Sequence, residues 1–182
     1  MNDKAEKVYA DAFFTLCLEE TPDTLKNTLG ELSALDGIFR EQPDFVKLLG
    51  TPTVTMDEKL GMIKDIIADG VSEYTGNLLC VLTERGRMGC FSGIVKNFRA
   101  LYNEHFRIAE ITVTASAPLS ESVREMIAAK MSEVTGKTVS IKEKVDPSII
   151  GGVVIDYGST RYDGSVRTRL NELKKELGGV IA

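Results

Sequence analysis

The segment Gly136-Lys137-Thr138 resembles the end of a phosphate-binding P-loop. In a P-loop, backbone amides cradle the phosphates and the lysine contacts them, which requires a glycine five residues before the Gly-Lys pair. Met131 occupies that position here. The segment also lies between an expected helix and an expected strand, the reverse of the order that points amides at phosphate. We therefore interpret Gly136 as the end of a helix.

Two further features could belong to a chemical site. Gly151 and Gly152 lack the third glycine of a dinucleotide-binding loop, and they precede an expected strand. A bulge or a close backbone approach explains them better. His105, the single histidine, excludes a multi-histidine metal site, and the sequence has no nucleophile elbow that would give it a partner serine. We interpret His105 as a solvated or interdomain side chain.

Cysteines and charged residues do not indicate a reaction either. The three cysteines (Cys17, Cys80 and Cys90) have no paired spacing, which favours small buried hydrophobes over a disulfide or a zinc site. The carboxylates are spread over polar helix faces, so that no acid–base pair can be nominated. We therefore expect no catalytic residue, no metal and no cofactor.

Three arginines near the C-terminus could bind phosphate: Arg161, Arg167 and Arg169. Their spacing around an expected hairpin and helix equally suits ion pairs with Asp163 and Glu172. We favour the ion pairs. The sequence thus favours a protein without catalytic activity of its own.

The first hundred residues are typical of a helical bundle with short connections. Six helices are expected, over residues 3–20, 21–40, 43–49, 55–70, 72–85 and 88–105. Thr21 is a candidate cap of the second helix, and Thr55 and Glu58 form a capping box at the start of the fourth. Gly86 ends the fifth helix.

The hydrophobic period changes to two near residue 106, which indicates a second domain. Strands are expected over 108–115, 139–145 and 152–157, with a hairpin partner over 160–162 and helices over 120–134 and 165–177. The expected fold class is therefore α + α/β, with a six-helix bundle over 1–105 and a small β-α-β-β-α domain over 106–182.

The first and fifth helices carry more apolar surface than an ordinary bundle helix needs. On the first helix, apolar side chains from Tyr9 to Cys17 cover about 200° at 3.6 residues per turn, against the roughly 100° that one buried face requires. Either both helices are central in the bundle, or one side of each forms a groove for an amphipathic helix of another protein.

Four segments, in order along the chain, resemble the F-type ATP synthase delta subunit family, whose mitochondrial counterpart is the oligomycin-sensitivity-conferring protein. They cover residues 8–13 (VYADAF), 82–87 (LTERGR), 139–158 (VSIKEKVDPSIIGGVVIDYG) and 162–170 (YDGSVRTRL). The resemblance implies a six-helix N-terminal bundle whose first and fifth helices receive the N-terminal helix of an α subunit of the catalytic head. By position, the residues lining that groove would be Tyr9, Ala12, Phe13, Leu78, Val81 and Arg85.

The resemblance also implies a second interface, in which the C-terminal domain contacts the C-terminal end of the b-type peripheral stalk. The candidate residues for that contact are Gly151, Gly152, Asp163, Gly164 and Arg167. The expected function is a non-catalytic stator subunit that links the α3β3 head to the stalk, resists rotary torque and couples ion translocation to ATP synthesis. The expected location is the cytoplasmic face of the cell membrane, as a peripheral protein.

Composition agrees with a folded protein of this kind. The 182 residues are 43% hydrophobic and 27% charged, with a formal net charge of −5, and no apolar run approaches the roughly 20 residues of a membrane span. A nucleic-acid-binding module is an alternative for the second domain, but it predicts a basic stripe and exposed stacking aromatics, which are not evident. A small transferase is a third possibility, and it would be stabilised by a nucleotide or an acyl donor.

Overall fold

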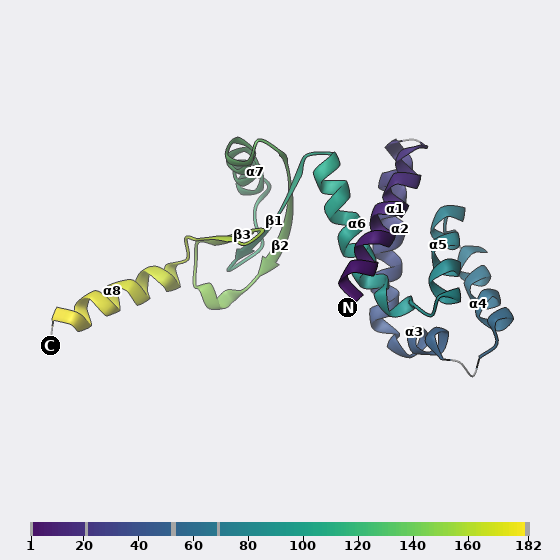
Figure 1. Ribbon diagram of the computed structural model, residues 1–182. Coiled ribbons are helices and arrows are strands. Elements are labelled where there is room, and N and C mark those ends of the chain that lie inside the picture. Colours follow the sequence, from purple (N-terminus) through teal and green to yellow (C-terminus); the bar gives the residue numbers. More distant parts are fainter. Residues whose placement is uncertain (1, 21, 52–53, 69, 181–182) are drawn as a thin grey trace. The chain divides into compact units, whose positions relative to one another are not determined.

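The computed structural model describes residues 2–180 apart from residues 21, 52–53 and 69. The chain forms two compact units, Met1–Tyr102 and Asn103–Ala182 (Figure 1). The boundary expected after residue 105 lies at the end of α6, which is three residues beyond Tyr102, the last residue of the first unit.

In the described residues of the first unit, all regular secondary structure is helical. It contains α1 (Asn2–Leu18), α2 (Pro22–Glu41), α3 (Pro43–Gly50), α4 (Met56–Ala68), α5 (Glu73–Glu84), the 3₁₀ turn η1 (Met88–Cys90) and α6 (Phe91–His105). Phe98 of α6 is fully buried, and its ring lies 5.5 Å from that of Phe13 and 5.6 Å from that of Phe14 on α1. Apolar residues of α2 and α5, such as Leu32 and Leu79, are also fully buried.

Local hydrogen bonds fix where two of these helices begin. The capping box at Thr55 is confirmed: the Glu58 amide donates to Thr55 Oγ1 at 3.4 Å, and the Thr55 amide donates to Glu58 Oε2 at 3.1 Å. Ser72 caps α5, and the hydroxyls of Ser72 and Thr75 each donate to the Glu31 carboxylate at 2.6 Å. These bonds tie the start of α5 to α2. The expected cap Thr21 lies outside the described residues.

The second unit is a four-stranded sheet with helices. Its elements are β1 (Ile108–Ala115), α7 (Glu121–Thr135), β2 (Thr138–Val145), the 3₁₀ turn η2 (Pro147–Ile149), β3 (Val153–Tyr157), β4 (Thr160–Asp163) and α8 (Val166–Val180). The strand order is β2-β1-β3-β4, with β1 and β2 parallel and the other pairs antiparallel. The order along the chain is β-α-β-β-β-α. The expected β-α-β-β-α order was one strand short, because the hairpin partner pairs with β3 over four residues.

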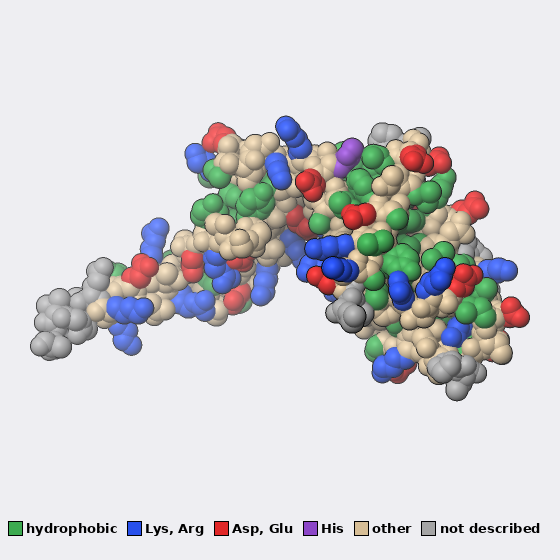
Figure 2. All heavy atoms as spheres, viewed as in Figure 1, with side chains coloured by type: hydrophobic (Ala, Val, Ile, Leu, Met, Phe, Trp, Pro, Cys, Tyr) green, Lys and Arg blue, Asp and Glu red, His purple; other side chains and the backbone are tan. Residues whose placement is uncertain are grey.

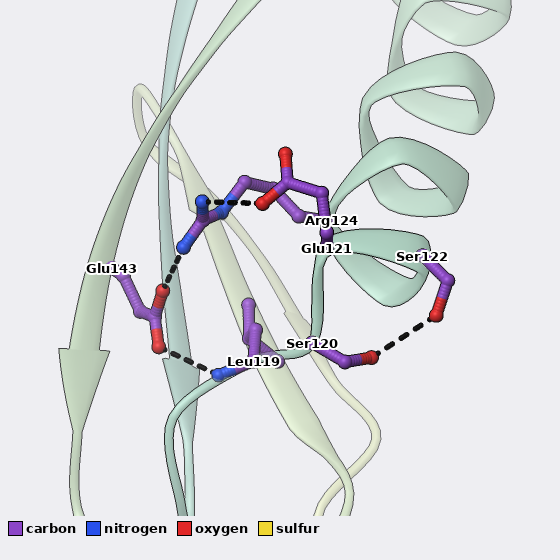
Figure 3. A network of polar contacts seen from close by, with 6 residues as sticks. All are labelled: Leu119, Ser120, Glu121, Ser122, Arg124 and Glu143. Carbon is purple, nitrogen blue, oxygen red and sulfur yellow. Dashed lines mark hydrogen bonds and ion pairs between the residues drawn. The ribbon is translucent and has the colours of Figure 1, made fainter.

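Helix α7 packs on one face of the sheet over a core of Ile111, Val113 and Met131. Glu143 of β2 holds the start of α7 in place, since its carboxylate accepts from the Leu119 amide at 2.8 Å and from Arg124 Nη2 at 2.9 Å (Figure 3). These two bonds, the amide bond first, lower the pKa of Glu143.

The expected helix end at Gly136 is confirmed. This glycine has φ +65°, and its amide donates to the Ser132 carbonyl at 2.8 Å. Across the described residues, no helix combines the length and the apolar character needed to cross a membrane.

Candidate functional site

A groove lies between α1 and α5. The hollow has a volume of about 240 Å³ and is lined by Tyr9, Ala12, Phe13, Leu16, Tyr74, Asn77, Leu78 and Val81. Hydrophobic side chains reach the surface of the first unit over the region of these two helices (Figure 2). The groove is therefore an apolar depression in an otherwise charged helical surface.

The floor and the walls of the groove differ in burial. Phe13 and Leu78 are buried, at 6% and 7% exposure, and Phe13 rests on Phe98. On the walls, Leu16 and Val81 are 47% and 41% exposed. The floor belongs to the core of the unit, whereas the walls present apolar area that the described chain leaves in water.

Polar contacts close the two ends of the groove. At one end, Arg87 Nη1 donates to the Tyr9 hydroxyl at 3.3 Å, and the guanidinium lies 5.7 Å from the centroid of the Tyr9 ring. At the other end, the Tyr74 hydroxyl donates to the Glu20 carboxylate, and this bond is the first cause of the raised pKa of Tyr74. Since Tyr9 pairs near the end of α5 and Tyr74 near the end of α1, the two helices run antiparallel along the groove.

The structure brings together five of the six residues assigned by resemblance to the head contact: Tyr9, Ala12, Phe13, Leu78 and Val81. Arg85 is not among the lining residues; it is the C-cap of α5, with its amide bonded to the Val81 carbonyl. Arg87, two residues later, is the arginine that contacts the groove wall.

Three lining residues were not assigned from the sequence: Leu16, Tyr74 and Asn77. Leu16 and Tyr74 belong to the wide apolar arcs of the first and fifth helices, so the helical period could have found them. Asn77 gave no such signal. It lies on the groove face because it is three residues after Tyr74 and four before Val81.

The residues assigned to the stalk contact lie around the start of α8, where they form a structural joint. Gly152 has φ +76°, and a Cβ atom there would lie 2.3 Å from the Gly164 carbonyl oxygen. This is the close backbone approach expected of the Gly151-Gly152 pair. The Gly164 amide donates to Val153, and the Val166 amide donates to the Gly151 carbonyl, both at 3.0 Å.

Asp163 and Arg167 complete this joint. The Asp163 carboxylate accepts from the Ser165 amide and from Thr168 Oγ1, both at 2.9 Å, and these bonds lower its pKa. They also satisfy donors at the start of α8. Arg167 Nη1 donates to Ser148 Oγ of η2 at 3.1 Å. The five residues therefore fix the start of α8 against β4 and η2.

Arg161 forms an ion pair, as favoured for the three arginines, but its partner is Asp156 and neither of the two acidic residues named for the group. Arg161 Nε lies 2.8 Å from Asp156 Oδ1, because the register of the β3–β4 hairpin places these two residues opposite each other. Asp163 is instead engaged at the start of α8.

Beyond the joint, α8 presents an exposed apolar stripe. Val166, Leu170 and Leu173 are 38%, 50% and 53% exposed. Apart from the half-buried Thr168, every side chain from 166 to 175 is exposed. This stripe and the groove are the two apolar surfaces that we consider for partner binding.

The cysteines offer little reactivity. Cys17 and Cys90 are buried and Cys80 is half-buried, and desolvation raises the pKa of Cys17 and Cys80. In the part of the chain that the structure describes, no group of three His, Cys, Asp or Glu side chains could hold a metal ion.

Comparison with known proteins gives a consistent result. The family model described as "ATP synthase delta (OSCP) subunit" matches residues 5–177. The chain is 34% identical over 170 residues to ATP synthase subunit delta of Anaeromyxobacter sp. (strain Fw109-5), covering 93% of this chain and 94% of that protein. It is also 34% identical over 173 residues to the chloroplastic ATP synthase subunit delta of Emiliania huxleyi, with 94% and 95% covered.

A solved structure shares the fold. A chain in the Toxoplasma gondii mitochondrial ATP synthase hexamer superposes with a TM-score of 0.70 at 21% identity, covering 94% of this chain and 96% of that one.

Proposed function

The chain belongs to the ATP synthase delta (OSCP) subunit family, and from this membership we propose that it is a non-catalytic stator subunit. In this role it links the α3β3 head to the b-subunit stalk at the cytoplasmic face of the membrane. Rotation of the central shaft, driven by ion flow, exerts a reaction torque on the head. A protein with two separate interfaces holds the head against that torque. Its loss uncouples ion flow from ATP synthesis and leaves ATP hydrolysis by the isolated head intact.

The observation that carries this proposal is the groove between α1 and α5. Its walls expose Leu16 and Val81 around the buried floor of Phe13 and Leu78. An amphipathic helix that presents anchors at i, i+3, i+4 and i+7 fits such a groove. Each 100 Å² of apolar surface that it covers contributes about 2.5 kcal/mol, from which the costs of association are subtracted. We assign the N-terminal helix of an α subunit as the occupant.

The substitution Val81→Asp tests this assignment. It places a charge on the exposed wall of the groove, where the folded chain tolerates it but a docked helix would bury it unpaired. We expect the affinity for a peptide of the α-subunit N-terminal helix, measured by isothermal titration calorimetry, to fall at least about tenfold, or about 1.4 kcal/mol.

Val134→Asp is the matched control, because Val134 is an exposed valine of α7 in the other unit. It should leave the affinity for the peptide unchanged, and both variants should keep the circular dichroism of the parent chain. Unchanged binding by the folded Val81→Asp variant would show that the groove is not the head site.

A further inference from the structure

The first unit contains a second hollow, which we call the α2–α3 pocket. It has a volume of about 440 Å³, and its described walls come from α2, from the start of α3 and from residues 70–71, which precede α5. It shares no lining residue with the groove between α1 and α5. Volumes of about 300–1,000 Å³ are typical of pockets that bind small molecules. Because three segments of the chain bound it, the α2–α3 pocket suits a compact ligand.

Most of the residues that line this pocket are apolar. Leu35 and Phe39 of α2 are buried, at 4% and 5% exposure, and the ring of Phe45 on α3 stacks on that of Phe39 with 5.9 Å between the centroids. Ile38, which also lines the pocket, is 51% exposed. A ligand with an apolar body would therefore remove the Ile38 side chain from water, and this burial favours binding.

Glu31 is the one charged residue among the described residues that line the pocket. Its carboxylate is half-buried, and Oε2 accepts from Ser72 Oγ and from Thr75 Oγ1, both at 2.6 Å. Within the described chain, no donor bonds the other oxygen, Oε1, and no Lys or Arg forms an ion pair with Glu31. Two hydroxyls thus fix a carboxylate that still has an oxygen for a donor. Charge-assisted hydrogen bonds to a carboxylate are stronger than neutral ones, so a cationic donor is favoured.

We propose that the α2–α3 pocket binds a small organic cation, namely an amine attached to an aromatic or aliphatic body. The ammonium group donates to Glu31, and the apolar body covers Leu35, Ile38 and Phe39. An anionic ligand would meet the charge of Glu31 without a compensating Lys or Arg among the described lining residues. This site is separate from the groove and does not depend on the proposed stator function.

Three probes with the same phenylbutyl body test the charge preference on the full-length chain. They are phenylbutylamine, phenylbutanol and phenylbutyrate, and their binding is followed by NMR titration of the methyl groups. We expect the amine to bind at least about fivefold more tightly than the alcohol at low salt, and the carboxylate to bind most weakly. The difference should shrink in high salt. Equal affinities for the amine and the alcohol, or tightest binding of the carboxylate, would overturn the proposal.

The substitution Glu31→Gln tests whether this carboxylate makes the contact. It removes the charge and retains an oxygen that can accept from the Ser72 and Thr75 hydroxyls. The preference for the amine over the alcohol should disappear, while circular dichroism shows that the fold is kept. Glu84→Gln is the matched control, since Glu84 is exposed on α5 and does not line the pocket, and it should preserve the preference. A preference that survives Glu31→Gln would show that the amine binds elsewhere.

The substitution Ala34→Phe tests whether the apolar body occupies the hollow. Ala34 is an exposed residue of the lining, so a larger side chain there would fill the pocket without entering the core. It should weaken the binding of both the amine and the alcohol, whereas Ala100→Phe, at an exposed alanine of α6, should not. Unchanged binding by Ala34→Phe would contradict the assigned site. Displacement of the amine by the α-subunit peptide would mean that the pocket receives a protein, and the assignment of a small molecule would then be wrong.

Discussion

The two apolar surfaces of this protein are built in different ways. The groove of the first unit is concave, and its floor is continuous with the core, because Phe13 rests on the buried Phe98. The stripe of the second unit lies on a single helix, whose start is fixed by Gly152, Asp163 and their hydrogen bonds. A concave surface selects its occupant by shape, whereas a lone helical stripe selects by repeat and charge. The groove should therefore depend on core packing, and the stripe on backbone geometry at the joint.

Truncation of the shared core is expected to have the largest effect. Phe98→Ala removes a fully buried ring that contacts Phe13 and Phe14, and such a change costs about 3–5 kcal/mol. Denaturant unfolding followed by hydrogen exchange should show lost protection in residues 2–102 and weaker binding of the α-subunit peptide.

Leu16→Ala provides the contrast, because Leu16 is an exposed wall residue. It should weaken peptide binding with little change in the free energy of unfolding. If Phe98→Ala left the groove able to bind with full affinity, the dependence of the groove on the core would be refuted.

A backbone change at the joint should have a smaller effect, confined to the second unit. Gly152→Ala introduces a Cβ atom 2.3 Å from a carbonyl oxygen at a positive φ, and we expect a loss of about 2–4 kcal/mol in the free energy of unfolding.

Gly158→Ala separates the two causes of that loss. Gly158 also has a positive φ, +59°, but a Cβ atom there has no described neighbour within 4 Å. It should cost only about 1 kcal/mol. Equal losses for the two variants, measured by urea titration, would mean that the close approach at Gly152 contributes nothing.

The two units should also differ in their pH response, which is the smallest effect. Among the described residues with a shifted pKa, the second unit has three depressed carboxyls, whereas the first has one, Glu58, beside three raised thiol and phenol groups. In the second unit, hydrogen bonds lower the pKa of Glu143, Asp146 and Asp163. A carboxyl whose folded pKa is depressed stabilises the fold above its unfolded pKa, and this contribution disappears as the pH falls through the folded value. Acid should therefore destabilise the second unit below about pH 4.5, the ordinary value for Glu143.

In the first unit, the raised pKa values of Cys17, Tyr74 and Cys80 act in the other direction. A raised folded pKa stabilises the fold below the unfolded value, and the contribution is lost as the pH rises above about 9, the ordinary value for the thiols. Hydrogen exchange measured at several pH values and corrected for intrinsic rates would check both the acid and the alkaline prediction. Glu143→Gln should reduce the acid sensitivity of the second unit, and an unaltered acid response would contradict the role given to Glu143.

Local signals in the sequence predicted most elements of the fold. The strand over 108–115 has the observed bounds, and the capping box of Thr55 and Glu58 and the helix end at Gly136 are as expected. The misses concern long-range pairing. The sequence could not show that residues 160–163 form a full strand, or that Arg161 faces Asp156, because strand register is set between segments.

For the two candidate surfaces as well, the sequence determined the local pattern and the tertiary structure determined the exposure. The sequence by itself determined that α1 carries a wide apolar arc and α8 an apolar stripe of Val166, Leu170 and Leu173, since both follow from spacing along one helix. The tertiary structure decided that Ala12 and Leu16 face an open groove, that Arg87 rather than Arg85 reaches Tyr9, and that the α8 stripe stays exposed. The physical reason is that helical periodicity fixes the direction of a side chain about its own axis, while burial depends on which distant segments pack against it.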